Sequence, residues 1–343
     1  MYNINLIEKY LVELLNIPSP TGYTKDIVNY IKNQLDEMDI YYEVSNKGIL
    51  LAKIEGINKE DEITFSAHVD TLGAMVKGIK ESGRLSIDQI GGYMPNTIEG
   101  ENCIIHTRFN KKYEGTLQTT KPSIHIHGNE ARELKREIKN YEVIIDEEVF
   151  SKDDVKNLGI DVGDIISFDT RTKITKSGFI KSRYLDDKAS VALLLYIIKY
   201  IKTNNILLRK SINFFFSNYE EVGHGASSFV PRKTKEFIAV DMGCPGENQN
   251  STEYDVCICT KDSNGPYDYE FISRLVKVCK ENNINYKLDI YPNYGSDATA
   301  ALKSGLNSGF ALIGPGIYAS HGYERTNIKS ILETISLIIN YIK

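Results

Sequence analysis

The N-terminal part of the chain combines helix-like and strand-like patterns of apolar residues. Leu, Ile, Val and Tyr recur at spacings of three and four in residues 5–16 and 24–38, which predicts two helices with one apolar face each. Thr24 stands at the start of the second stretch and is the expected N-cap. Apolar or alternating runs follow and predict strands at residues 41–46, 48–56 and 62–70.

The pattern changes between about residue 73 and residue 168. Short segments of alternating apolar and polar residues are separated there by Gly, Asn and Pro turns, which is typical of small all-β domains. These segments cover residues 74–79, 84–87, 102–107, 114–120, 123–128 and 164–169. A polar stretch at residues 128–140 interrupts them and is expected to be a solvated connection or a short helix. The region is therefore predicted to form a small β-rich barrel or sandwich.

From about residue 180 helices and strands alternate again. Helices are expected at residues 188–202, 269–282, 297–305 and 327–343, and strands at 211–217, 236–243, 255–260, 286–292 and 307–315. This alternation predicts a mostly parallel sheet with helices on both faces. The expected fold class is α/β with an inserted small β-barrel domain. The α/β domain would comprise residues 1–72 and 169–343, and the insertion residues 73–168.

Charge and composition narrow the classes of function. The 343 residues carry a formal net charge of −5, with 41% apolar and 25% charged residues, which is ordinary globular usage. No basic face is dense enough to neutralise a run of phosphates, so nucleic acid is not an expected partner. The N-terminus lacks a signal-peptide pattern, and no apolar stretch reaches membrane-spanning length. Five scattered cysteines indicate reduced thiols, and we expect a cytoplasmic protein without a membrane partner.

Acidic and imidazole side chains gather at the predicted ends of strands and starts of helices. In open α/β sheets ligands bind at this edge, because strand carboxyl ends and helix N-termini converge on one crevice. Carboxylates and imidazoles together are the ligands of zinc and similar divalent ions. The positions concerned are His68 with Asp70, Asp186 with Asp187, Glu220 with Glu221, Asp241, and His321.

Single members of this set also have simpler structural explanations. Asp186 and Asp187 open an apolar helix, where a carboxylate can cap the helix but can also bridge two cations. His68 and Asp70 share one face of a strand, so Asp70 can accept the second imidazole N–H and fix which nitrogen faces a metal.

Neighbouring Glu220 and Glu221 point in different directions, so we expect one to bind metal and the other to act as a general base. Charges just past a buried strand are also common in solvent-facing loops. The remaining histidines are expected to be structural or to lie on the surface, and they are His106, His125, His127 and His224.

The order of these motifs resembles that of a known enzyme family. HVDTLG, YLDDKAS, NYEEVGHGA, VDMG, GSDATA and SHGYE together resemble the tetrahedral aminopeptidases, co-catalytic metallopeptidases that include glutamyl and deblocking aminopeptidases. The similarity covers nearly the whole chain, including the inserted β-rich region. It implies a di-zinc exopeptidase-like fold and the removal of N-terminal residues from peptides.

The resemblance also implies roles for individual residues. One divalent ion, Zn²⁺ or Co²⁺, would be held by His68 and Asp241, and a second by Glu221 and His321. Asp186 would bridge the two ions, and Glu220 would be the general base, with Asp70 as a further catalytic residue. Members of the family tend to have a cis peptide bond after the bridging carboxylate, which here lies between Asp186 and Asp187.

Self-association is a further implication of the resemblance. The inserted domain, residues 73–168, would build dimers that assemble into a hollow tetrahedral dodecamer; dimer and dodecamer both remain open. The chain departs from the family at Thr71, where an acidic residue is common, after Glu221, where about one residue is missing, and around His321, which lies in YASHGYE. These departures leave the implied metal ligands intact and concern substrate preference.

Other functions are compatible with parts of the pattern. Related two-metal sites cleave N-acyl amino acids or small amides, so a deacylase is the main alternative. Some family members are labelled endoglucanases, but sugar-binding clefts favour aromatic platforms and this chain has no tryptophan. A peptide-binding assembly without catalysis is the non-enzymatic alternative. Peptides are the expected substrates.

Overall fold

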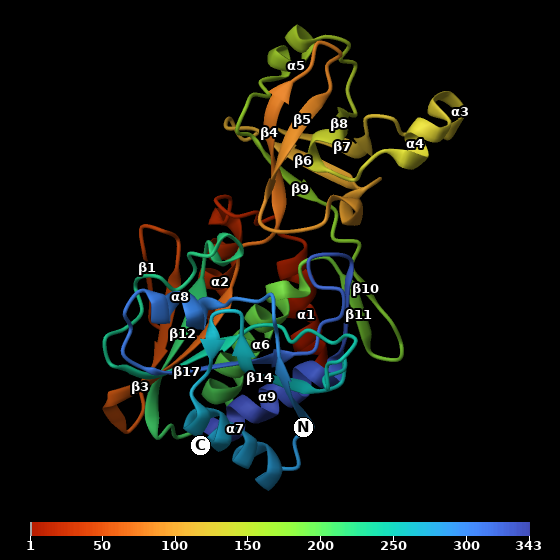
Figure 1. Ribbon diagram of the computed structural model, residues 1–343. Helices are drawn as coiled ribbons and strands as arrows, with labels where there is room; N and C mark the ends of the chain where they lie inside the picture. Colours follow the sequence, from red (N-terminus) through yellow and green to blue (C-terminus); the bar gives the residue numbers. More distant parts are fainter. Residues whose placement is uncertain (1) are drawn as a thin grey trace. The chain divides into compact units, whose positions relative to one another are not determined.

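The chain folds into two compact units, seen in a computed structural model that describes residues 2–343 (Figure 1). The larger unit runs up to Asp70 and resumes at Arg171–Lys343, whereas the smaller unit is Thr71–Thr170. The smaller unit therefore interrupts the larger one in sequence. The dimerisation role expected for residues 73–168 stays a prediction.

A nine-stranded mixed sheet forms the centre of the larger unit. Its strands are β1 (Tyr42–Val44), β2 (Leu50–Ile54), β3 (Asn58–His68), β12 (Lys210–Ser217), β13 (Thr234–Val240), β14 (Val256–Asp262), β15 (Gly265–Pro266), β16 (Tyr286–Ile290) and β17 (Gly309–Pro315). They lie in the order β1-β2-β12-β3-β13-β17-β14-β15, with β16 beside β14. The central strands β12, β3, β13 and β17 are parallel, and antiparallel pairs lie toward both edges. The carboxyl ends of the four central strands therefore share one edge of the sheet.

Helices flank this sheet. They are α1 (Ile4–Leu15), α2 (Lys25–Glu37), α6 (Leu185–Thr203), α7 (Tyr269–Glu281), α8 (Asp297–Lys303) and α9 (Ile328–Ile342). Both α6 and α8 contact β3. Ser66 of β3 donates a hydrogen bond to Asp297 in α8, so its neighbours Phe65 and Ala67 lie on the opposite face. Helix α6 is buried from its first residue through Ile198, as expected for a helix that is apolar on all sides.

A small antiparallel sheet of the larger unit connects two parts of the chain that matter for the site. It contains β10 (Lys173–Ile174), β11 (Phe179–Ser182) and β18 (Glu324–Asn327), in the order β10-β11-β18. Strand β11 leads into α6, and β18 follows the loop that contains His321. Residues 182 and 324 are paired across this sheet.

The smaller unit is a closed six-stranded β-barrel. The strands β4 (Gly73–Ile79), β5 (Leu85–Ile90), β6 (Asn102–His106), β7 (Lys112–Thr119), β8 (Tyr141–Ile145) and β9 (Ile165–Phe168) close in the order β4-β5-β8-β7-β6-β9. Short helices occupy the connections: η1 (Pro95–Ile98), α3 (Ile124–His127), α4 (Asn129–Glu133), η2 (Ile138–Asn140) and α5 (Lys152–Leu158). The barrel interior is formed by alternate side chains such as Val76, Leu85 and Val143, all of which are buried.

The predicted fold class is confirmed, and three local predictions differ from the structure. The main sheet is mixed rather than mostly parallel, because β2 runs antiparallel to β12 and β14 runs antiparallel to β17. Residues 123–128 are not a strand: Ile124 and Ile126 are exposed, and the segment forms the single helical turn α3. Thr24 stands at the N-cap of α2 but makes no capping bond, because its hydroxyl accepts from Asn218 instead. Strands β8, β10, β11, β15 and β18 and helix α5 were not predicted.

Among residues 2–343 no helix has the length and apolar character needed to cross a membrane.

Candidate active site

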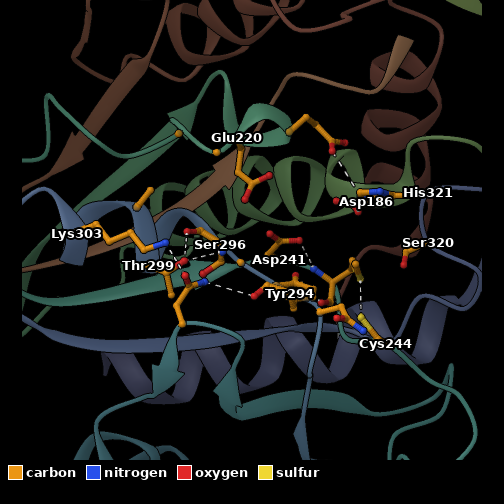
Figure 2. Close-up of a pocket in the computed structure, with 18 residues that line it drawn as sticks. Asp186, Glu220, Asp241, Cys244, Tyr294, Ser296, Thr299, Lys303, Ser320 and His321 are labelled. Atoms are coloured by element: carbon orange, nitrogen blue, oxygen red, sulfur yellow. Dashed lines mark hydrogen bonds and ion pairs between the residues drawn. The ribbon is translucent and has the colours of Figure 1, made fainter. Parts of the chain in front are cut away.

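The residues singled out in the sequence meet at the carboxyl edge of the central strands. Each lies where a strand has just ended or a helix is about to start, which is the edge where α/β sheets bind ligands. His68 ends β3, Glu220 and Glu221 follow β12 in the short helix η3 (Glu220–Val222), Asp241 follows β13, Asp186 opens α6, and His321 lies after β17. Figure 2 shows Asp186, Glu220, Asp241 and His321 around one pocket.

His68 is held in one orientation by the main chain. Its Nδ1 lies 2.8 Å from the carbonyl oxygen of Asp70. A carbonyl oxygen only accepts hydrogen bonds, so Nδ1 carries the hydrogen and Nε2 presents its lone pair. Nε2 lies 3.1 Å from Oδ1 of Asp186. Two acceptor atoms at this separation require a positive charge shared between them, either a proton or a metal ion.

Asp186 stands between the two histidines. Its Oδ1 faces Nε2 of His68, and its Oδ2 lies 3.3 Å from Nε2 of His321. Nε2 of His321 is in turn 3.5 Å from Oε2 of Glu221. The two carboxylate oxygens therefore point to two different groups, which is the arrangement of a bridging ligand. The peptide bond between Asp186 and Asp187 is cis, as the family resemblance implied.

Asp70 has a different role from the one predicted. Its carboxylate does not accept the imidazole N–H of His68; the nearer oxygen, Oδ1, is 3.8 Å from Nδ1. Instead Oδ1 accepts from the Glu220 amide (3.1 Å), Oδ2 accepts from the Glu221 amide (3.3 Å), and Thr21 donates to Oδ2 at 2.7 Å. The acceptor for the imidazole is the Asp70 main chain. The side chain of Asp70 holds the two glutamates in place.

The site concentrates negative charge in largely buried positions. Burial and the nearby charge of Asp186 raise the pKa of Glu221 to about 8 and that of Asp241 to about 7. Burial, together with Asp241, also raises the pKa of Glu220 well above its usual value. Burial would raise the pKa of Asp186 as well, but hydrogen bonds from His321 and His68 hold it well below the usual range. These carboxylates need cations to be ionised together.

The donor atoms fit divalent metal ions. Ligand atoms of His68, Asp186 and Glu221 lie within 4.8 Å of one another, and so do those of His68, Asp187 and Asp241. Oε1 of Glu221 and Oδ1 of Asp187 are buried and have no hydrogen-bond partner among the described residues. Imidazole nitrogen with carboxylate oxygen is a donor set for zinc and related ions. The second group contains Asp187, which the sequence analysis did not assign as a ligand.

These distance groups divide the ligands differently from the family resemblance, which pairs His68 with Asp241 and Glu221 with His321. The contacts of Asp186 favour the division implied by the family resemblance. One oxygen of Asp186 faces His68 and the other faces His321, so the two histidines would belong to different ions. His68 belongs to both distance groups. Its Nε2 lies close to more than one carboxylate, at 3.1 Å from Asp186 and 3.8 Å from Glu220.

A pocket of about 420 Å³ opens in front of these residues. Asp186, Glu220, Glu221 and Asp241 contribute to its wall, while uncharged polar residues such as Asn264 and Thr299 form another part. Lys303 is the only lysine or arginine among the described residues that line it. Its ammonium group donates to Oδ1 of Asn264, and among residues 2–343 no carboxylate is seen to form an ion pair with it. Figure 2 shows Lys303 at one end of the pocket, opposite Asp186 and His321. The pocket thus combines a carboxylate cluster with one uncompensated cation.

Three residues of the site were not assigned a role from the sequence. Tyr294 donates to the Met242 carbonyl at 2.9 Å beside Asp241. The carboxylate of Glu324 accepts from main-chain amides at the site, and Lys303 lines the pocket. Glu324 lies within the SHGYE motif, so its position was recognisable while its function was not. Lys303 follows the GSDATA motif by three residues on a short helix.

The other histidines lie outside the pocket. His106 is buried in the barrel, where its Nε2 is 2.8 Å from the Ser167 hydroxyl. His125 and His127 belong to the short helix α3, and His224 is exposed just after η3. None of these residues lines the pocket.

Comparisons with known proteins concern the family and the fold of the chain. Residues 48–337 match the family model described as M42 glutamyl aminopeptidase. The chain is 48% identical to "Putative aminopeptidase YhfE" of Bacillus subtilis (strain 168) over 343 residues, which cover 100% of this chain and 99% of that protein.

Solved structures share the fold. The TET aminopeptidase from a marine sediment archaeon, Thaumarchaeota archaeon SCGC AB-539-E09, is similar with a TM-score of 0.89 and 18% identity, over 98% of this chain and 96% of that one. The TET1 peptidase of Pyrococcus horikoshii, described as able to assemble into a tetrahedron or a large octahedral shell, is similar with a TM-score of 0.87 and 20% identity, over 98% and 99%. Since the family model matches most of the sequence, the chain belongs to the M42 glutamyl aminopeptidase family of peptide hydrolases.

Proposed function

We propose that this protein is a metal-dependent aminopeptidase that uses two divalent cations, Zn²⁺ or Co²⁺, to remove N-terminal residues from peptides. The observation that carries the proposal is the position of Asp186, whose two oxygens face His68 and His321 separately inside a buried group of carboxylates. His68 and Asp241 hold one cation, Glu221 and His321 hold the other, and Asp186 is shared. When bound, the pair polarises a carbonyl group and lowers the pKa of water.

Glu220 acts as the general base and then as the general acid. Its carboxylate is 3.8 Å from Nε2 of His68 and lines the pocket, and Asp70 fixes its main chain. Burial raises the pKa of Glu220, which strengthens the carboxylate as a proton acceptor. Glu220 accepts a proton from the water that attacks the peptide carbonyl carbon. It returns that proton to the leaving amine nitrogen as the C–N bond breaks.

The charge of the site favours a free N-terminus. The α-ammonium group of a peptide is a cation, and the wall formed by Asp186, Glu220, Glu221 and Asp241 offers carboxylates to bind it. An N-acyl substrate lacks that charge, so Glu220, the carboxylate of the wall that holds no cation in this proposal, would gain no ion pair from it. This argues for an aminopeptidase over the deacylase alternative.

Lys303 gives the pocket a preference for acidic N-terminal residues. A side chain that extends from the carboxylate wall across the pocket would meet the ammonium group of Lys303, which is bonded to Asn264 and has no ion-pair partner in the described part of the chain. A glutamate or aspartate side chain supplies the missing charge, whereas a lysine side chain is repelled. The name of the family, glutamyl aminopeptidase, is consistent with this preference.

Removing the metal should abolish activity and reduce stability. We expect the parent protein to bind two zinc or cobalt ions per chain, and dialysis against a chelator to stop peptide hydrolysis until either metal is restored. Because cations bind only the folded site, the metal-loaded protein should also unfold at a higher temperature than the apoprotein. Asp186→Asn should lower the metal content, whereas Asp88→Asn at an exposed position should not. Full activity in metal-free protein would exclude the proposal.

Glu220→Gln should separate metal binding from catalysis. The amide keeps the shape of the side chain but cannot accept the proton, so we expect turnover to fall by about 10²–10⁴-fold while the metal content stays at the parent level. The matched control is Glu247→Gln on an exposed loop, which should behave like the parent. Initial rates on free and N-acetylated peptides would be measured for all three proteins. A Glu220→Gln variant with the parent's rates on every substrate would show that another group is the base.

Lys303→Glu should reverse the substrate preference. We expect kcat/KM for peptides with N-terminal glutamate to fall by about 10–100-fold relative to peptides with N-terminal lysine, since an attraction becomes a repulsion across the pocket. Lys277→Glu on the exposed face of α7 is the charge-matched control. The readout is the ratio of kcat/KM for the two peptides. An unchanged ratio in Lys303→Glu would remove this residue from substrate selection.

The protein should self-associate through the barrel unit, as a dimer or a tetrahedral dodecamer. Phe109, Ile126 and Phe150 of this unit are each at least 80% exposed, and we take them as candidates for the contact between copies of the chain. In sedimentation velocity we expect species much heavier than the 38.8 kDa chain. Ile126→Asp should shift the distribution toward smaller species, whereas Leu207→Asp, exposed in the other unit, should not. A parent protein that is monomeric at micromolar concentration would contradict this proposal.

A further inference from the structure

Glu324 connects two segments that carry the proposed ligands. It is the first residue of β18, its side chain is buried, and each of its carboxylate oxygens accepts one main-chain hydrogen bond. Oε2 accepts from the amide of Asp186 at 3.1 Å, and Oε1 accepts from the amide of His321 at 3.0 Å. The two amides are more than 130 residues apart in the sequence, so a single side chain fixes the distance between them.

Both amides lie where the backbone is irregular. Asp186 and Asp187 have non-helical dihedral angles within the first turn of α6, and Tyr184 before them is in the left-handed region. His321 has a φ of 61°, in a loop between β17 and β18. A buried amide in such a segment needs an acceptor from outside the local helix or strand. Glu324 provides that acceptor for both.

The small sheet β10-β11-β18 brings Glu324 to this position. Glu324 pairs with Ser182 in the register of β11 and β18. Four residues after Ser182 the chain reaches Asp186, and three residues before Glu324 it passes His321. The carboxylate closes the gap between these two short segments, at the point where the side chains of Asp186 and His321 approach within 3.3 Å.

We infer that Glu324 is a positioning residue that sets the separation of Asp186 and His321 and thereby the affinity of the site for the cation that these two residues share. This inference rests on the proposed two-cation site. Glu324 itself does not contact the pocket and needs no role in proton transfer. Supporting groups of this kind orient metal ligands, and their loss typically lowers metal affinity by about 10–100-fold.

The chemistry of the contacts explains why a carboxylate is needed. Both partners of Glu324 are N–H donors, so both of its terminal atoms must be acceptors. A glutamine has one acceptor oxygen and one NH₂ group, which would face an amide donor without forming a bond. An aspartate keeps two acceptors but is one methylene shorter. Either replacement therefore leaves one of the two ligand-bearing segments without its anchor.

Glu324 has a close structural counterpart elsewhere in the chain. Asp164 in the barrel unit is also buried, and its two oxygens also accept one main-chain amide each, from Arg108 (3.2 Å) and Asp161 (2.8 Å). It lies in the other unit and has no proposed ligand beside it. Asp164→Asn is therefore a control for the general effect of removing a buried two-amide acceptor.

The test measures metal binding directly. Parent protein, Glu324→Gln, Glu324→Asp and Asp164→Asn are stripped of metal, and Zn²⁺ affinity is measured by competition with a chromophoric chelator. The visible absorption spectrum of the Co²⁺-loaded forms reports ligand geometry, and thermal unfolding of the metal-free forms reports stability. Glu324→Asp provides the measurement if Glu324→Gln does not fold.

We expect the Glu324 variants to bind one of the two zinc ions about 10–100-fold more weakly, with an altered Co²⁺ spectrum and with activity that recovers at high zinc concentration. Asp164→Asn should keep the parent's affinities and spectrum. Parent-like affinities and an unchanged spectrum in the Glu324 variants would overturn the inference, even if their metal-free forms unfold at lower temperature. A parent protein that binds no zinc would instead overturn the proposed function.

Discussion

The structure of the site depends on the electrostatics of several carboxylates held together away from water. Asp186, Glu220, Glu221 and Asp241 line one pocket, and burial with mutual repulsion raises the pKa of three of them. Removing an ion from water costs several kcal/mol unless it is paired. The imidazoles of His68 and His321 lie beside Asp186 in this cluster. Bound cations would supply further positive charge, which makes this arrangement suited to a metal-dependent hydrolase.

The fold makes such a cluster possible through its strand directions. Strands β12, β3 and β13 are parallel neighbours, so the residues that follow them meet although His68 is about 150 residues from Glu220 in the sequence. Main-chain groups then fix the side chains: the Asp70 carbonyl orients His68, and the Asp70 carboxylate holds the amides of Glu220 and Glu221. The main chain of the site is therefore held by contacts between neighbouring strand ends.

Much of this could be predicted from the sequence, for physical reasons that also mark the limits. Apolar runs such as 211–217 can only be buried strands, and polar residues directly after them must lie at the sheet edge. Short exposed segments gave no such signal, so the turn at residues 123–128 was mistaken for a strand. The predicted contact between the Asp70 carboxylate and the His68 imidazole was wrong. Alternation along a strand predicts which face a residue occupies, but not whether its side chain or its carbonyl makes the contact. Glu324 was missed as an anchor because its partners are amides distant in sequence.

The proposed site and the inserted barrel belong to different units of the chain. All the proposed ligands, the base and the positioning residues lie before residue 71 or after residue 170, within one compact unit. The barrel occupies the interval between Asp70, which orients the base, and the β10–β11 hairpin that leads to Asp186. Substitutions on the exposed barrel surface can therefore change association without altering a ligand or its hydrogen-bond partners. The bond from Glu324 to Asp186 is then important, because it fixes the chain soon after it returns from the insertion.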